Sequence, residues 1–388
     1  MNRISIKFNL PLLILINFSI KNKLTTNKVK MKNKLITTAL SSFIVMGSVS
    51  AIAQTTISGN LDLTYNAVSA DTKTVTGNSY RGFGKESQLN FANKGKLSNG
   101  IDYAAGFSWE IDGPDSLTTA AALENHYIDF IMGNTTISIS SDHVNNTDQT
   151  LVNPVGYGYT GGDGIGNSVS IYPKNLADNN GLGLGVTHNF GVLRATLNYQ
   201  PNSESTASND VANSLVSTNV ETATNSSKSI VLQGDLGVKG LNVLAGKKME
   251  KKDPIAATNS APTDKDGTRL SVAYTVGQFT IAGDKIKLGG QLVNQNGTVT
   301  TVGNHELEGK AIGLAFAVNK DLSIGVYQAK AESNQKDVAA AEEKTKAITL
   351  GYNLGPVTLQ AQIKDTENNA GLAANDGKTG GIKLSTKF

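Results

Sequence analysis

The chain has 388 residues, a formal net charge of +3 and no cysteine. The absence of cysteine excludes disulfide bonds, catalytic thiolates and cysteine-ligated metal sites. After Gln54 no stretch holds 18 consecutive apolar residues, which excludes a membrane-spanning helix from that part of the chain.

The first 53 residues have the features of a targeting segment. They contain eight Lys or Arg and no Asp or Glu. Residues 31–53 combine a basic start, an apolar core at 35–49 and an Ala-Ile-Ala cleavage site, which predicts a secretory signal peptide. Residues 1–30 are then an upstream extension from a misplaced start. The alternative is a membrane anchor at 10–20, but about eleven apolar residues are short for a ~30 Å hydrocarbon core.

The basic charge of the chain belongs to this targeting segment. Without its eight basic residues, 27 of the original 35 Lys and Arg remain against 32 Asp and Glu, a net charge of −5. The charge balance therefore gives no reason to expect a nucleic-acid partner.

From Gln54 onward, apolar and polar residues alternate with a period of two. In 57–65, Ile, Leu, Leu and Tyr lie on one face, and Ser, Asn, Asp and Thr on the other. Because only every second strand residue of a membrane barrel meets lipid, this pattern predicts an all-β, transmembrane, antiparallel up-and-down barrel over 54–388. The sixteen expected strands are 56–66, 86–96, 100–111, 123–132, 135–141, 181–190, 192–200, 228–237, 240–249, 268–277, 278–292, 307–319, 321–331, 345–354, 356–366 and 378–388.

The connections between these strands alternate in length. Short turns such as 353–356 and 318–321 are separated by polar stretches such as 201–227, 251–267, 295–306, 332–344 and 366–377. Tight periplasmic turns and extended external loops are typical of outer-membrane barrels. Two places depart from the pattern. The segment 167–172 also reads as a strand, and a phase change between Ile281 and Ile286 predicts a β-bulge.

The two faces of the predicted strands suggest different surroundings. The inward face carries small polar residues such as Ser58, Thr196 and Gln362, so we expect water to fill the interior. Aromatic residues concentrate at strand ends, where interfacial girdles need them. Those expected at the outer interface are Tyr65, Trp109 and Tyr199, and those at the periplasmic turns are Phe190, Tyr274, Phe279, Tyr352 and Phe388.

The chain from 54 to 388 resembles the general-diffusion porins of Gram-negative outer membranes. The similarity is carried by Thr55–Gly59 after the signal, by the block from Gln88 to Tyr103 with its Lys94–Leu97 turn, and by the terminal Phe388. The resemblance implies a sixteen-stranded homotrimer in outer-membrane lipid that passes small solutes and ions. It also implies that Phe388 is the signal read by the barrel-assembly machinery, and that a loop at 142–180 folds into the barrel and narrows it.

Charged residues of this loop and of the facing wall are the candidate pore residues. Asp142, Asp148, Asp163 and Asp178 against Lys174 give the loop an acidic balance, which either favours cations or belongs to a solvated loop without effect. By alternation, Arg194, Arg269, Lys364 and Lys383 face inward from the wall.

No arrangement of residues points to catalysis. The four histidines are scattered, so neither a nucleophile with its base nor a zinc site can be assembled from the sequence. The oxygen-rich stretch 142–148 is a weak candidate for Ca²⁺, and otherwise no cofactor or metal is expected. The function expected is passive diffusion through a water-filled channel. The alternatives are a substrate-specific channel and a plugged surface barrel acting as an adhesin or structural protein.

Overall fold

The computed structural model describes residues 54–72, 80–114, 122–140, 151–152, 172, 183–200, 225–252, 265–293, 299–333, 341–369 and 375–388. The chain divides into two units, Met1–Val49 and Ser50–Phe388. The predicted extension 1–30 and signal peptide 31–53 lie outside the described residues. Within the described part of the chain, no helix is long and apolar enough to cross a membrane.

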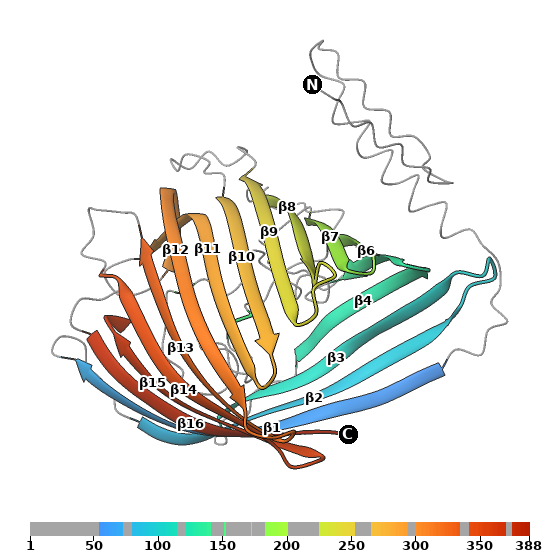
Figure 1. The fold of residues 1–388 in the computed structure, drawn as a ribbon. Coiled ribbons are helices and arrows are strands. Elements are labelled where there is room, and N and C mark those ends of the chain that lie inside the picture. The colour runs from blue at the N-terminus through green and yellow to red at the C-terminus, as the bar shows by residue number, and fades with distance from the viewer. Residues whose placement is uncertain are drawn as a thin grey trace, which may run out of the picture. The chain divides into compact units, whose positions relative to one another are not determined.

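The second unit forms one closed antiparallel barrel in which every strand pairs with its neighbours in sequence and β1 pairs with β16 (Figure 1). The sixteen strands are β1 (Gln54–Thr72), β2 (Tyr80–Lys96), β3 (Asp102–Pro114), β4 (Ala122–Met132), β5 (Thr135–Ser140), β6 (Gly183–Asn189), β7 (Leu193–Gln200), β8 (Asn225–Gly234), β9 (Leu241–Lys252), β10 (Lys265–Val276), β11 (Phe279–Val293), β12 (Val299–Ala317), β13 (Leu322–Ser333), β14 (Glu343–Asn353), β15 (Val357–Glu367) and β16 (Asn375–Lys387). The predicted fold class and strand number are confirmed. The ring closes without the alternative strand at 167–172, of which only Tyr172 is described.

The connections at one end of the barrel are short, as predicted. That end, called here the turn end, holds the short connections, of which 133–134 and 277–278 are two residues long. Gly133 and Gly277 both have a φ of +59°, a conformation that glycine adopts without steric cost. The opposite end, the loop end, holds the remaining connections, of which 141–182 is the longest.

Several strands extend further toward the loop end than the sequence pattern indicates. The largest difference concerns the expected loop 295–306, because β12 begins at Val299 and leaves only 294–298 as its connection to β11. Residues 299–306 contain only two apolar residues, Val299 and Val302, which lie three positions apart and therefore show no alternation. The backbone of Val299–Thr301 pairs with β11 and extends the β11–β12 hairpin toward the loop end. The hydropathy pattern does not predict this pairing.

The expected bulge between Ile281 and Ile286 is wrong. The register of β11 with β12 runs without interruption from Phe279 to Gly289, and its shift lies between Gly289 and Gln291. Ile281 points outward and is 52% exposed, whereas Ile286 points inward and is fully buried. The phase change therefore reflects an apolar residue on the inner face.

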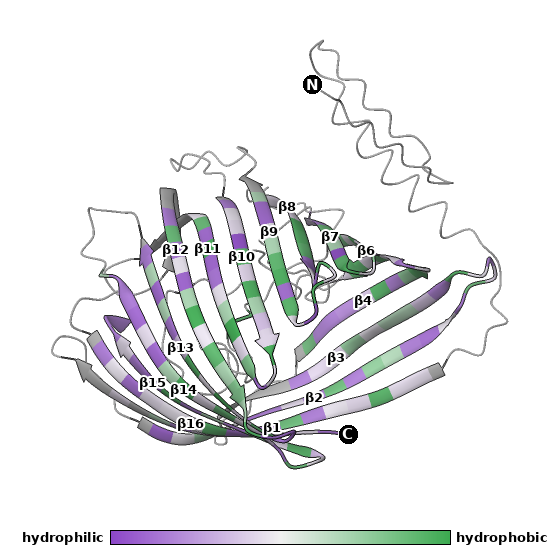
Figure 2. Ribbon diagram, in the orientation of Figure 1, coloured by the Kyte–Doolittle hydropathy of each residue, from purple (hydrophilic) through white to green (hydrophobic). Residues whose placement is uncertain are grey.

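Hydrophilic and hydrophobic residues alternate along the strands (Figure 2), and their burial shows that the two faces of the barrel differ as predicted. Large apolar side chains such as Leu63, Trp109 and Ile348 are exposed on the outward face. Thr64, Thr196 and Gln362 are buried on the inward face. One region of the inner wall is different, because Ala273, Ala282, Ile286, Leu307, Tyr327, Ala329, Ala331 and Ala347 form an apolar cluster with Val152 and Tyr172. The expectation of a uniformly polar, wet lining is therefore wrong over β10–β14.

Candidate functional site

The long connection 141–182 contacts the inner wall at each of its described residues. Val152 is fully buried and Tyr172 is 4% exposed, and both belong to the apolar cluster on β10–β14. The backbone N–H of Leu151 donates a hydrogen bond to Ser271 Oγ at 2.9 Å. The connection starts from β5 and returns to β6, so these contacts reach strands on another part of the ring. Leu151, Val152 and Tyr172 are therefore held inside the barrel against β10–β14.

Small residues on the wall make room for this segment. On β12, a Cβ at Gly309 would lie 2.8 Å from the Tyr172 ring, and one at Gly313 would overlap the carbonyl of Val152. Gly309 and Gly313 pair with Ala331 and Tyr327 of β13, which share the inward face. The signal for this contact is present in the sequence as the inward Gly309, Ala311, Gly313 and Ala315 of β12, where β7 and β15 have Thr, Asn and Gln. Sequence reasoning missed it.

A buried polar cluster fixes the same contact. Arg269 on β10 and Asp284 on β11 are joined by Nε to Oδ1 at 3.0 Å and by Nη2 to Oδ2 at 3.2 Å, and both side chains are fully buried. The hydroxyl of Tyr172 donates to Oδ2 of Asp284 at 2.8 Å. One carboxylate thus neutralises the guanidinium and binds the inserted segment.

The other three predicted wall residues also lie on the inward face, at separate places. Lys383 on β16 forms an ion pair with Asp62 on β1, and the lysine side chain is only 12% exposed. Lys364 on β15 is 1% exposed. Arg194 lies beside the turn end of β7, where Nη2 donates to Gln233 Oε1 at 2.8 Å. The structure does not gather the four cations into one cluster.

Three acidic residues of the inward face lie on β1, β2 and β4, and Lys383 on the neighbouring β16 pairs with one of them. Asp62 on β1 pairs directly with Glu86 on β2, so the two share the inward face. Asp129 on β4 is buried on the same face and accepts a 2.6 Å hydrogen bond from Ser138. Arg269 on β10 and the buried Lys248 on β9 lie about half a ring away in strand order.

The predicted loop charges Asp142, Asp148, Asp163, Lys174 and Asp178, and with them the possible Ca²⁺ segment 142–148, lie outside the described residues. Among the residues that are described, no cluster of three or more His, Asp or Glu side chains has the arrangement of a metal site.

Comparison with known proteins decides which family this barrel represents. Residues 37–371 match the family model described as Gram-negative porin. The chain belongs to the Gram-negative porin family. It is therefore an outer-membrane diffusion channel, with the short turns at its periplasmic end and the long connections outside. No curated protein sequence matches the chain.

Solved porin structures share the fold at low sequence identity. An anion-selective porin from Comamonas acidovorans is 15% identical, with a TM-score of 0.63 over 87% of this chain and all of its own. A triple mutant of the Rhodopseudomonas blastica porin is 14% identical, with a TM-score of 0.55 over 86% of this chain and all of its own. Since both identities are low, these matches support the barrel architecture alone.

Proposed function

We propose that this porin passes small hydrophilic solutes and ions by passive diffusion, through a lumen narrowed by the segment 141–182, and that it carries no catalytic activity. The observation that supports this proposal is the fixation of Leu151, Val152 and Tyr172 on one side of an otherwise polar inner wall. A segment fixed on one side narrows the channel and leaves the acidic wall of β1–β4 facing water.

The charges of the narrow zone are proposed to set its ion preference. The segment contributes Asp142, Asp148, Asp163 and Asp178 against Lys174, and the facing wall contributes Asp62, Glu86 and Asp129. Rings of acidic residues favour cations. One structural relative is named an anion-selective porin, so this chain is proposed to differ from it in preference. Arg194, Arg269, Lys364 and Lys383 are proposed to tune passage from the wall.

Assembly is proposed to follow the family pattern. Residues 31–53 direct export and are removed, Phe388 is read by the barrel-assembly machinery, and three copies associate in the outer membrane. The exposed aromatic side chains Tyr65, Phe83, Phe107 and Trp109 on the outward face of β1–β3 support an apolar environment for that part of the wall, either lipid or a neighbouring copy.

Single-channel recording in planar bilayers tests the function. Ohmic conductance that no single solute blocks supports general diffusion. Saturable block by one sugar or phosphate compound would instead establish a substrate-specific channel. If folded protein, verified by a heat-dependent gel shift, inserts without conducting, the barrel is plugged, and the adhesin or structural alternative replaces the proposal.

A further inference from the structure

Outward side chains of β11–β14 form rows that run across the strands, because directly paired residues on neighbouring strands share a face. One row is apolar and consists of Ile281, Leu314, Val326 and Ile348, and it continues to Ile363 on β15. Four residues further toward the loop end, a second row consists of four lysines, Lys285, Lys310, Lys330 and Lys344, each directly paired with the next. The four lysine side chains belong to adjacent strands, whose spacing is about 4.8 Å.

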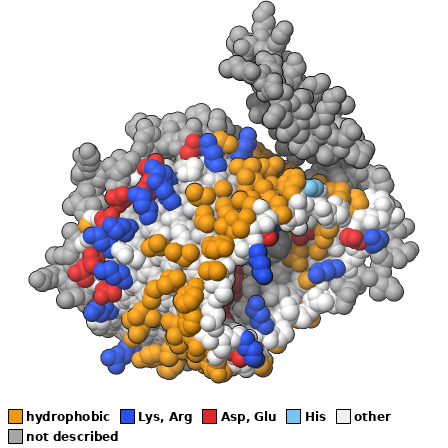
Figure 3. Space-filling model, in the orientation of Figure 1, with side chains coloured by type: hydrophobic (Ala, Val, Ile, Leu, Met, Phe, Trp, Pro, Cys, Tyr) orange, Lys and Arg blue, Asp and Glu red, His pale blue; other side chains and the backbone are white. Residues whose placement is uncertain are grey.

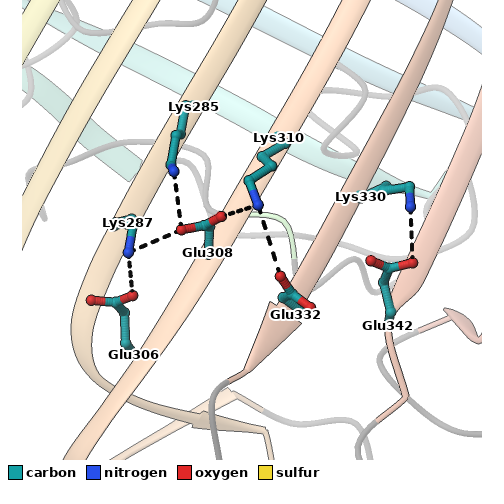
Figure 4. A network of polar contacts seen from close by, with 8 residues as sticks. All are labelled: Lys285, Lys287, Glu306, Glu308, Lys310, Lys330, Glu332 and Glu342. Carbon is teal, nitrogen blue, oxygen red and sulfur yellow. Dashed lines mark hydrogen bonds and ion pairs between the residues drawn. The ribbon is translucent and has the colours of Figure 1, made fainter.

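Like charges placed directly opposite each other destabilise a sheet, so the lysine row needs nearby anions. Some are supplied by the protein on the loop side of the row (Figure 4). Glu308 binds Lys310 and lies 3.4 Å from Lys285, and Glu342 lies 3.2 Å from Lys330 and 3.4 Å from Lys344. The lysines remain accessible despite these ion pairs, since the side chains of Lys285 and Lys310 are 51% and 52% exposed.

The side of the lysine row that faces the apolar row carries a groove. It has a volume of about 610 Å³ and is lined by Ile281, Ile312, Leu314, Val326, Ile348 and Ile363, with Gln328, Lys346 and Asp365 at its polar margin. All of these side chains project from the outer wall of the barrel. Figure 3 shows the same separation, with apolar surface below and a band of charged side chains along the loop ends.

We propose that this face binds a phosphorylated lipid of the outer leaflet, with an acyl chain in the groove and its phosphate on the lysine row. The order of rows matches such a lipid, since the apolar groove comes first and the cations follow where a headgroup phosphate would lie. The loop end faces outside, so the lipid belongs to the outer leaflet. A second copy of the chain fits less well, because it would need acidic residues to meet the lysines, and the nearby carboxylates already pair with them.

Tryptophan quenching by brominated lipids tests the proposal, since the chain has a single tryptophan, Trp109 on β3. A Trp109→Phe, Ile348→Trp variant moves the probe to the groove, and the native protein is the matched control on a different part of the outer wall. Each is reconstituted in phosphatidylcholine vesicles that contain brominated phosphatidylcholine or brominated phosphatidic acid. We expect the fraction of phosphatidic acid that quenches the groove probe to be lower than that of phosphatidylcholine by about fivefold or more, because a single lysine near anionic lipid contributes about fivefold. Trp109 should show no such preference.

Charge variants test whether the lysine row causes the preference of the groove probe for phosphatidic acid. Lys330→Gln with Lys344→Gln should reduce the preference at the groove to about twofold or less. Lys320→Gln, in the turn between β12 and β13, should leave it unchanged. A heat-dependent gel shift verifies that each variant is folded.

Three results would overturn the proposal. The first is equal quenching by both lipids at the groove, and the second is an equal preference at the groove and at Trp109. The third is a groove probe protected from both lipids, which would show that protein covers this face. Channel conductance is measured separately, so failure of lipid binding and failure of the diffusion function are distinguished.

Discussion

The hydroxyl of Tyr172 donates a 2.8 Å hydrogen bond to Asp284 across 112 residues of sequence. Asp284 also carries the two hydrogen bonds from the buried Arg269. The position of the inserted segment and the charge balance of the wall therefore depend on one carboxylate.

Replacing Tyr172 by Phe should loosen the inserted segment. The variant loses a hydrogen bond to a buried charged group, which is worth about 1.5–3 kcal/mol, but keeps the packing of the ring in the apolar cluster. Single-channel recordings should show more frequent current fluctuations and a changed mean conductance. Tyr352→Phe, at an exposed tyrosine on the outward face, is the control. Recordings identical to those of the unchanged protein would show that the apolar contacts alone hold the segment.

Replacing Asp284 by Ala should lower the stability of the whole barrel. The guanidinium of Arg269 would remain buried without its carboxylate, and breaking a buried pair in this way costs about 3–5 kcal/mol. Urea unfolding in lipid vesicles measures the loss. The double variant Arg269→Met, Asp284→Leu removes both charges and should recover most of the stability. A double variant as unstable as Asp284→Ala would contradict this account.

Replacing Gly313 by Val should displace the inserted segment from the wall. The new side chain would occupy the place of the Val152 carbonyl. We expect an altered conductance, with folding retained because β12 keeps its backbone pairing. Gly377→Ala on β16 is the control, since its Cβ would lie an ordinary 3.7 Å from the Ser69 carbonyl. If Gly313→Val has the conductance of this control, the segment does not narrow the channel at this place.

Much of the architecture was predictable from the sequence, because alternation reports which face of a strand meets lipid. It gave sixteen strands and placed Arg194, Arg269, Lys364 and Lys383 on the inward face. Alternation contains no information about which residues lie opposite each other on neighbouring strands. The Lys383–Asp62 pair and the row from Lys285 to Lys344 therefore required the register.

The sequence predicted which residues form the inserted segment, but not which wall residues they contact. The contact depends on the small size of Gly309 and Gly313, and the role of these two glycines is apparent only once Tyr172 and Val152 lie against them. Ile286 was misread for the same reason, because an apolar residue on the inner face contradicts a polar lining until Val152 and Tyr172 are placed beside it.

Replacing Asp62 by Asn should shift ion preference toward anions. The ammonium group of Lys383 would lose its ion-pair partner and contribute positive charge to the wall. Reversal potentials measured across a tenfold KCl gradient report the shift. Asp321→Asn in a short turn, where Asp321 pairs with Lys320 outside the lumen wall, is the control and should cause no change. A shift toward cations would contradict the proposed role of this pair.

Replacing Phe388 by Ala should reduce the amount of barrel assembled in cells and leave refolding in detergent intact, if its ring acts as a recognition signal. Gly59→Val tests the local structure separately, because a Cβ at Gly59 would lie 2.6 Å from Cε2 of Phe388. This variant should impair refolding in detergent as well. Heat-dependent gel mobility measures both. Equal defects of Phe388→Ala in cells and in detergent would assign the ring a structural role only.

The pairing of β1 with β16 also has a consequence for biogenesis. Phe388 exchanges backbone hydrogen bonds with Gly59, and β16 pairs with β1, so the seam joins the last strand of the barrel to the first. No ring can be completed before β16 has been made, and any product without β16 keeps two unpaired strand edges that invite aggregation. A chain in transit across the periplasm therefore depends on protection of the edges of β1 and β16 until the two strands meet.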